Sequence, residues 1–276
     1  MLALTALPSL IATDLDGTLL RADGSISERT QLALKRARAA GVELVMVTGR
    51  PARHVANIDG VADFGGVVIC VNGALIYDLD HDRVVQEVRL SGALACELVL
   101  ALRRELPGVC FAVEVGLEYG WESSYGRQRK RTESPPLPIA DALVLCERGV
   151  NKLIARHAEL PTEQLIRRAR EVLADRATVS FSGAPFVEIG SRNASKAFAL
   201  AAYCAERKIE RARVLSFGDM PNDLPMLEWA GHSVAMANAH ASVLSTATET
   251  TRSNEEDGVA WMIEGLLSRY APQMAR

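Results

Sequence analysis

Four aspartates follow two short apolar stretches of the chain, a pattern that can perform metal and phosphate chemistry. Asp14 and Asp16 come directly after the first stretch, and Asp219 and Asp223 follow the second. Carboxylates a few ångström apart raise one another's pKa, and a divalent cation removes that penalty. Oxygen ligands suit Mg²⁺, which also takes a phosphate oxygen, whereas the five histidines show no zinc-ligand spacing. The residue types therefore predict a Mg²⁺ site that handles phosphate.

Groups that can bind phosphate follow other apolar stretches. They are the hydroxyls of Thr18 and Thr48, the ammonium of Lys196 and the backbone N–H groups of Gly17, Gly49 and Gly73. A metal ion and Lys196 would offset the repulsion between a carboxylate nucleophile and a phosphate. We therefore expect Asp14 to attack phosphorus and form an aspartyl phosphate. Asp16, two residues on, is expected to protonate the leaving oxygen and then to activate the hydrolytic water.

The elements that must position these groups alternate between strand and helix. The stretches 10–13, 42–48 and 66–73 are short and β-rich, and helical patterns separate them. Ser27 is a suitable N-cap and Gly41 a suitable C′ residue for the first helix. Such alternation predicts an α/β fold with a Rossmann-like parallel sheet and helices on both faces. The polar groups would then meet at the carboxyl edge of the sheet, where such folds bind ligands.

The middle of the chain shows a different pattern, which indicates an inserted α+β domain. Strand pairs around short turns and isolated helices replace the regular alternation there, and the alternation returns from Phe186 with the segment VEIG. We therefore expect a discontinuous catalytic core formed by residues 1–78 and 187–276, with a cap domain over residues 79–186.

The composition is that of a globular chain from a reducing compartment. Of 276 residues 49% are hydrophobic, and the net charge of −3 gives no reason to expect nucleic acid or an acidic membrane as a partner. The basic run from Arg127 to Arg131 is more typical of a solvated loop than of a nucleic-acid site. The five cysteines are scattered, and no apolar run reaches the ~20 residues of a membrane span. We expect a cytoplasmic protein.

Four motifs in order make the chain resemble the haloacid dehalogenase superfamily of phosphatases. They are DLDGT, VMVTGR, Lys196 and GDMPND. The insertion lies where the α/β cap of subclass IIB lies, so the resemblance is to the Cof-type group of sugar-phosphate phosphatases. It covers both halves of the core, whereas the cap is matched only in position and rough pattern.

The resemblance implies a role for each residue that matches a motif. Asp14 and Asp219 would bind Mg²⁺ through their side chains and Asp16 through its main-chain carbonyl. Asp223 would orient a metal-bound water or Lys196. The residues expected to contact the phosphate group of the substrate are Thr48, Lys196, Asn222, Gly49 and Arg50. Helix capping or packing is the alternative role for Arg50.

We interpret the chain as a Mg²⁺-dependent phosphomonoesterase for small phosphorylated metabolites, with sugar phosphates the favoured class. The alternatives are a phosphotransferase or phosphomutase on the same scaffold, and a non-catalytic protein that binds phosphorylated metabolites. The residues that read the leaving group are expected in the cap, where the candidates are Glu114, Tyr119, Trp121, Tyr125 and the basic run. Packing in the cap core or a place in an exposed loop is the simpler role for each of them. No motif indicates an oligomeric state.

Overall fold

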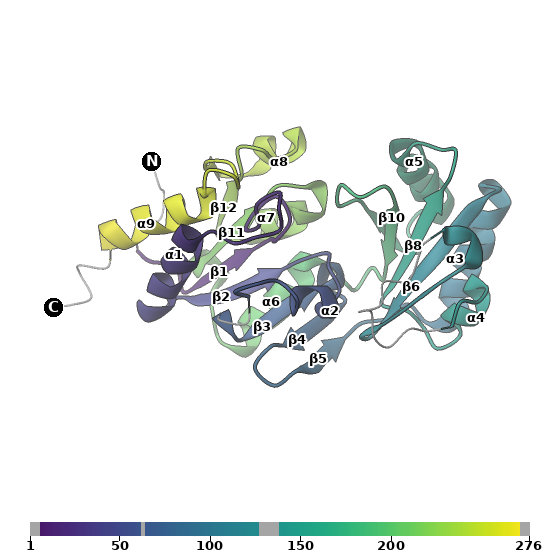
Figure 1. The fold of residues 1–276 in the computed structure, drawn as a ribbon, viewed down its shortest axis with the longest axis horizontal. Helices are drawn as coiled ribbons and strands as arrows, with labels where there is room; N and C mark the ends of the chain where they lie inside the picture. The colour runs from purple at the N-terminus through teal and green to yellow at the C-terminus, as the bar shows by residue number, and fades with distance from the viewer. Residues whose placement is uncertain (1–5, 62–63, 127–137, 271–276) are drawn as a thin grey trace. The chain divides into compact units, whose positions relative to one another are not determined.

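The computed structural model describes residues 6–61, 64–126 and 138–270, and the chain forms two compact units (Figure 1). The core unit combines the residues up to Val85 with those from Ser195 onward, and the cap unit comprises Gln86–Ala194. The basic run from Arg127 to Arg131 lies outside the described residues. Within the described part, no helix has the length and apolar character that crossing a membrane would require.

The core unit is built on one large sheet. Its strands are β1 (Leu10–Thr13), β2 (Glu43–Val47), β3 (Val67–Cys70), β4 (Leu75–Asp78), β5 (Arg83–Glu87), β11 (Val214–Gly218), β12 (His232–Ala235) and β13 (Glu249–Thr250). They lie in the order β13-β12-β11-β1-β2-β3-β4-β5. Pairs from β13 to β3 are parallel, and β4 turns back antiparallel to β3. This confirms the predicted parallel core. The first strand, β1, lies in the middle of the sheet.

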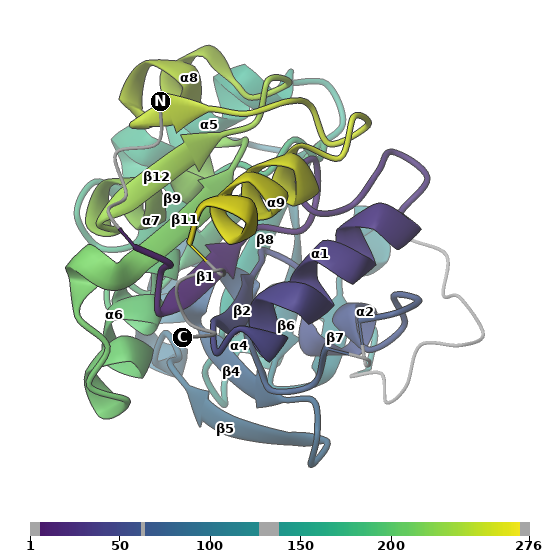
Figure 2. The same cartoon turned by 90° about the vertical axis from the view of Figure 1, so that its left-hand side faces the viewer.

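Helices cover both faces of this sheet. They are α1 (Glu28–Ala39), α2 (Ala52–Val55), α6 (Lys196–Glu206), α7 (Leu224–Trp229), α8 (Ala241–Thr246) and α9 (Gly258–Tyr270), with short 3₁₀ turns η2 (Val71–Gly73), η4 (Arg211–Arg213) and η5 (Pro221–Asp223). Apolar residues of β1, β2 and β3 share one hydrophobic cluster with α6 and Met226 of α7. Helices α1 and α9 pack together over the other face (Figure 2). Ser27 caps α1 as predicted, accepting from the backbone N–H of Thr30.

The cap unit is an antiparallel sheet with helices on one face. Its elements are α3 (Gly92–Glu105), β6 (Val109–Val115), β7 (Glu118–Trp121), η3 (Ser123–Tyr125), α4 (Ala142–Cys146), β8 (Lys152–His157), α5 (Thr162–Leu173), β9 (Thr178–Ser180) and β10 (Val187–Gly190). The strand order is β7-β6-β8-β10-β9. Alternate residues of β6, such as Phe111 and Val113, pack with α3 and α5 in a single buried cluster. The inserted α+β cap predicted from the sequence is therefore present.

The strand β10 corrects one expectation. Residues 187–190 were expected in the core, but they pair antiparallel with β8 and β9 in the cap sheet. Val187 and Ile189 enter the hydrophobic cluster of the cap, while Glu188, on the other face, pairs with Lys152 at 2.5 Å. A four-residue stretch such as VEIG fits either sheet, because only its distant partners decide where it pairs. The chain returns to the core unit at Ser195.

Candidate active site

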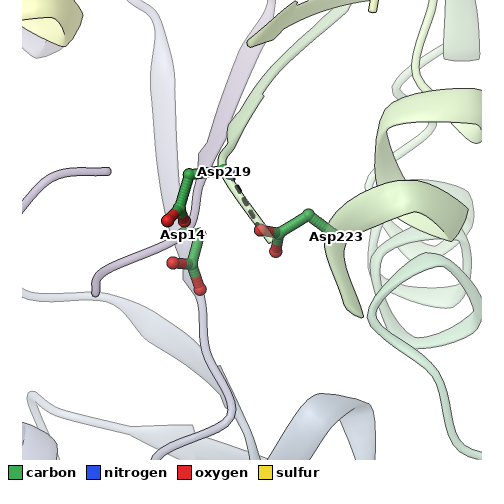
Figure 3. Close-up of side chains that lie close together, drawn as sticks. All are labelled: Asp14, Asp219 and Asp223. Carbon is green, nitrogen blue, oxygen red and sulfur yellow. Dashed lines mark hydrogen bonds between the residues drawn. The ribbon is translucent and has the colours of Figure 1, made fainter. Parts of the chain in front are cut away.

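Three aspartates converge at the carboxyl edge of the core sheet. Asp14 follows β1, Asp219 follows the neighbouring strand β11, and Asp223 ends the turn η5. All three are buried, and carboxylate oxygens from the three lie within 4.8 Å of one another (Figure 3). Parallel pairing of β1 with β11 produces this convergence, because it brings the ends of both strands to the same edge. The structure thus brings together side chains more than 200 positions apart in the chain.

Lys196 supplies the positive charge in this cluster. It is the first residue of α6, is almost completely buried, and its Nζ lies 2.5 Å from Oδ1 of Asp14 and 2.5 Å from Oδ1 of Asp223. Ser195 caps the helix by accepting from the backbone N–H of Phe198. Gly73 makes this approach possible: its φ is +96°, and a Cβ there would lie 2.2 Å from the carbonyl oxygen of Ser195.

Hydrogen bonds fix the orientation of the other two carboxylates. Oδ2 of Asp223 accepts from the backbone N–H groups of Asp219 and Met220, so only its Oδ1 faces Lys196. Oδ1 of Asp219 accepts from the Thr18 hydroxyl at 3.0 Å. Gly17 lies directly against the same carboxylate, because a Cβ at Gly17 would be 2.3 Å from Oδ2 of Asp219. The loop after β1 is therefore shaped around the aspartate that follows β11.

Burial and like charge determine the ionisation of this cluster. Burial raises the pKa of Asp14 well above its usual range; Lys196 opposes this shift, while Asp223 and Asp219 add to it. Burial, together with Asp223, raises the pKa of Asp219 to about 7. Burial alone would lower the pKa of Lys196, but attraction to Asp14 and Asp223 outweighs it and raises the pKa. Lys196 is therefore charged, among carboxylates that favour a second cation.

The donor set suits a hard divalent cation. Three carboxylates meet one ammonium, so when ionised they leave an excess negative charge in a buried site. All the converging anionic ligands are oxygen atoms, the ligand type that Mg²⁺ takes. Because both oxygens of Asp223 are engaged by Lys196 and backbone N–H groups, Asp14 and Asp219 are better placed than Asp223 to offer a direct ligand.

The predicted phosphate contacts lie on the adjoining strand ends. Thr48 follows β2 and is fully buried, and its hydroxyl accepts from the backbone N–H of Arg50. Asn222 donates to Oδ1 of Asn72 at 3.1 Å, and Asn72 adopts a positive φ of 54° in η2. Oδ1 of Asn222 is buried and has no hydrogen-bond partner among the described residues. Gly49 packs against the Asn72 side chain, which would lie 3.1 Å from a Cβ at that position.

Arg50 and Asp16 form a pair of their own. Nε of Arg50 lies 2.7 Å from Oδ2 of Asp16, and Nη2 lies 2.5 Å from Oδ1. Hydrogen bonding to Asp16 raises the pKa of Arg50. This contact with Asp16 was not among the roles expected for Arg50 from the sequence. Asp16 differs sharply from Asp14: its side chain is 53% exposed, against 7% for Asp14.

One contributor was not predicted. Asn238, in the loop after β12, donates from Nδ2 to the backbone carbonyl of Gly17 at 2.8 Å and accepts from the N–H of Asn254. The backbone N–H of His240, two residues on, donates to the carbonyl of Asp219. Asn238 lies outside the four motifs that identified the other site residues.

The cap residues proposed to read a leaving group are buried within the cap unit. Tyr119, Trp121 and Tyr125 belong to one hydrophobic cluster, with the first two rings 5.4 Å apart. Glu114 is also buried and pairs in register with Lys152 of β8. Packing explains the three aromatic side chains without a ligand.

Comparison with known proteins gives a consistent result along almost the whole chain. Residues 11–263 match the family of haloacid dehalogenase-like hydrolases. YxeH of Bacillus subtilis is 33% identical over 94% of this chain and 98% of its own. The 5-amino-6-(5-phospho-D-ribitylamino)uracil phosphatase YwtE of Bacillus subtilis is 29% identical over 95% of this chain and 99% of its own. The solved structure of the subclass IIB sugar phosphatase BT4131 shares the fold, with a TM-score of 0.77 and 19% identity. The match covers 93% of this chain and 98% of the BT4131 chain.

Proposed function

The chain belongs to the haloacid dehalogenase-like hydrolases and is a phosphatase of that family, and we propose that it hydrolyses small phosphomonoesters through an aspartyl phosphate on Asp14. The observation that carries this proposal is the buried contact of Asp14 with Lys196 beside two further aspartates. A structural ion pair would not need three converging carboxylates, whose mutual repulsion costs stability unless a ligand offsets it.

In the first step a carboxylate oxygen of Asp14 attacks phosphorus, and the bond from phosphorus to the leaving oxygen breaks. Asp16 gives its proton to that oxygen. In the second step water attacks the aspartyl phosphate, Asp16 takes the proton from the water, and Asp14 is released with inorganic phosphate. Lys196 holds Asp14 in place and offsets the negative charge that gathers around phosphorus. Thr48 and the backbone of Gly49 would donate to the phosphoryl oxygens, with Asn222 a further contact.

We propose Mg²⁺ as the cofactor, held by the side chains of Asp14 and Asp219 and the main-chain carbonyl of Asp16. When bound, the ion withdraws charge from the phosphoryl group and from the crowded carboxylates. Asp223 then positions other groups of the site: its Oδ1 contacts Lys196, and its Oδ2 accepts from the backbone N–H groups of residues 219 and 220.

The substrates we propose are small phosphorylated metabolites, and sugar phosphates are the first class to test. YwtE, similar along nearly its whole length, is named for a phosphate ester of a ribityl chain, which is a sugar-like polyol. A substrate of this kind offers hydroxyl groups to a polar binding site and an alkoxide as the leaving group. Departure of an alkoxide needs a proton, which is the task proposed for Asp16.

The test is phosphate release from sugar phosphates, nucleotides and vitamin phosphates, in Mg²⁺ or EDTA, by wild type and Asp14→Asn. We expect release that requires Mg²⁺ and falls by at least about 10³-fold in Asp14→Asn, because the nucleophile is lost. Release that survives the substitution would contradict the mechanism. Transfer of phosphate to a sugar hydroxyl in place of water would indicate the phosphotransferase alternative.

A further inference from the structure

Arg50 and Asp16 form a two-point ion pair that the mechanism proposed above does not use. Both nitrogens of the guanidinium edge contact both carboxylate oxygens, at 2.7 and 2.5 Å. A fork of this kind fixes the plane and direction of a carboxylate, whereas a single contact leaves it free to rotate. Asp16 needs such a restraint, because its side chain is half exposed and the Arg50 pair is its only side-chain hydrogen-bond partner among the residues that the structure describes.

The backbone around Arg50 is built to hold the guanidinium in place. The N–H of Arg50 donates to the hydroxyl of Thr48, and its carbonyl accepts from the N–H of Val71. Pro51 follows and excludes the α region for Arg50, so the chain cannot continue β2 directly into a helix. Val71, whose N–H donates to this carbonyl, is itself in the left-handed region with φ of 54°. Arg50 is thus anchored on both sides, and its side chain extends from a fixed point.

We propose that Arg50 is a positioning residue for Asp16: it holds the carboxylate of the general acid and base in the orientation that serves the leaving oxygen. This inference rests on the proposed function, because it assigns Arg50 a role only through the proton transfer by Asp16. It differs from a phosphate contact in a measurable way. Loss of a residue that acts through the general acid lowers kcat/KM most for substrates whose leaving group must be protonated.

The experiment compares kcat/KM of Arg50→Gln on two aryl phosphates. Phenyl phosphate releases a poor leaving group that needs the acid, and 2,4-dinitrophenyl phosphate releases a good one that does not. Because kcat/KM reports the steps up to departure of the leaving group, loss of general-base action in the second step does not enter. We expect kcat/KM to fall about 100-fold on phenyl phosphate and less than about threefold on 2,4-dinitrophenyl phosphate. Competitive inhibition by inorganic phosphate should change by less than about threefold.

Three further variants make the outcome decisive. Asp16→Asn should show the same asymmetry between the two substrates. Arg50→Lys keeps the charge but cannot contact both oxygens, so it should stay at least about tenfold below wild type on phenyl phosphate. Arg29→Gln is the matched control, because Arg29 forms a similar two-point pair with Glu264 between α1 and α9. It should leave both rates unchanged.

Equal losses on both substrates, with weaker inhibition by phosphate, would overturn the proposal and assign Arg50 to phosphate binding. Unchanged rates on both would reduce the pair to a surface ion pair. If Asp14→Asn retained wild-type activity, the proposed function itself would fail, independently of any result for Arg50.

Discussion

At the scale of single residues, the site separates two carboxylates that stand only two positions apart. Asp14 directly follows the central strand β1, is buried, and contacts Lys196. Asp16 lies in the loop, is half exposed, and contacts Arg50. A nucleophile benefits from exclusion of water and a fixed cation, whereas an acid and base must exchange protons with the leaving group and with water. The different surroundings therefore match the different tasks proposed for the two aspartates.

Asp219 gives a prediction on the pH dependence of metal binding. In the metal-free protein its pKa is about 7, and a carboxylate must lose its proton to bind a divalent cation. We therefore expect Mg²⁺ affinity to rise as the pH rises through about 7. Isothermal titration calorimetry at a series of pH values measures this. An affinity that is constant from about pH 6 to about pH 8 would contradict it.

The same shift affects stability in EDTA. Because burial raises the pKa of Asp219 in the folded protein, the folded chain binds this proton more tightly than the unfolded chain does. The free energy of unfolding should therefore decrease as the pH rises from about 4 to about 7, and the Asp219→Asn variant should show a smaller decrease over that range. Urea unfolding at each pH provides the measurement.

At the scale of elements, the site depends on close contact between η2 and the start of α6. Gly73 allows this contact, because a Cβ there would lie 2.2 Å from a backbone oxygen. Gly73→Ala should lower the free energy of unfolding by more than about 2 kcal/mol and reduce kcat/KM more than about tenfold, because Lys196 is displaced from Asp14. Gly41→Ala is the control: its φ is +82°, and no atom lies within 4 Å of the added Cβ.

Urea unfolding and steady-state kinetics on both variants separate backbone strain from displacement of Lys196. Gly41→Ala should lose about 1 kcal/mol and keep full activity, because only backbone strain is added. Equal effects of the two substitutions on stability and activity would show that the contact at Gly73 does not position Lys196.

The sequence predicts a helix or strand correctly where neighbouring residues alone determine it. The Ser27 cap, the Gly41 end of α1, and the positions of the first three strands along the chain follow from residues next to one another. The strand β10 did not follow, because its membership of the cap sheet depends on pairing with β8 more than 30 positions earlier. For the same reason the motifs identify Arg50 and Asp16 as site residues, but not their contact across 34 positions.

At the scale of the whole molecule, the chain forms two units that each have a hydrophobic core. The cap cluster includes Leu98 of α3, and a core cluster includes Leu200 of α6; both are fully buried. Each unit is a compact set of contacts, with the cap unit inserted into the core unit. Unfolding of such a chain need not follow a single two-state transition.

Matched truncations should reveal this independence. Leu98→Ala should lower the stability of the cap unit by about 2–5 kcal/mol, and Leu200→Ala that of the core unit by a similar amount. Amide hydrogen exchange followed by mass spectrometry should show loss of protection mainly within residues 86–194 for the first variant and mainly outside them for the second. Equal loss of protection across both units in either variant would indicate one cooperative unit.

The measurement that tests the central claim most directly uses Asp16→Asn with 2,4-dinitrophenyl phosphate. This substrate can phosphorylate the enzyme without the acid, but the aspartyl phosphate then lacks the base that would activate water. We predict a burst of dinitrophenol close to one equivalent per enzyme in Mg²⁺, and peptide mass spectrometry after acid quenching should find the phosphoryl group on Asp14. Turnover by the wild type combined with no burst in the variant, or with the phosphoryl group on another residue, would contradict the account.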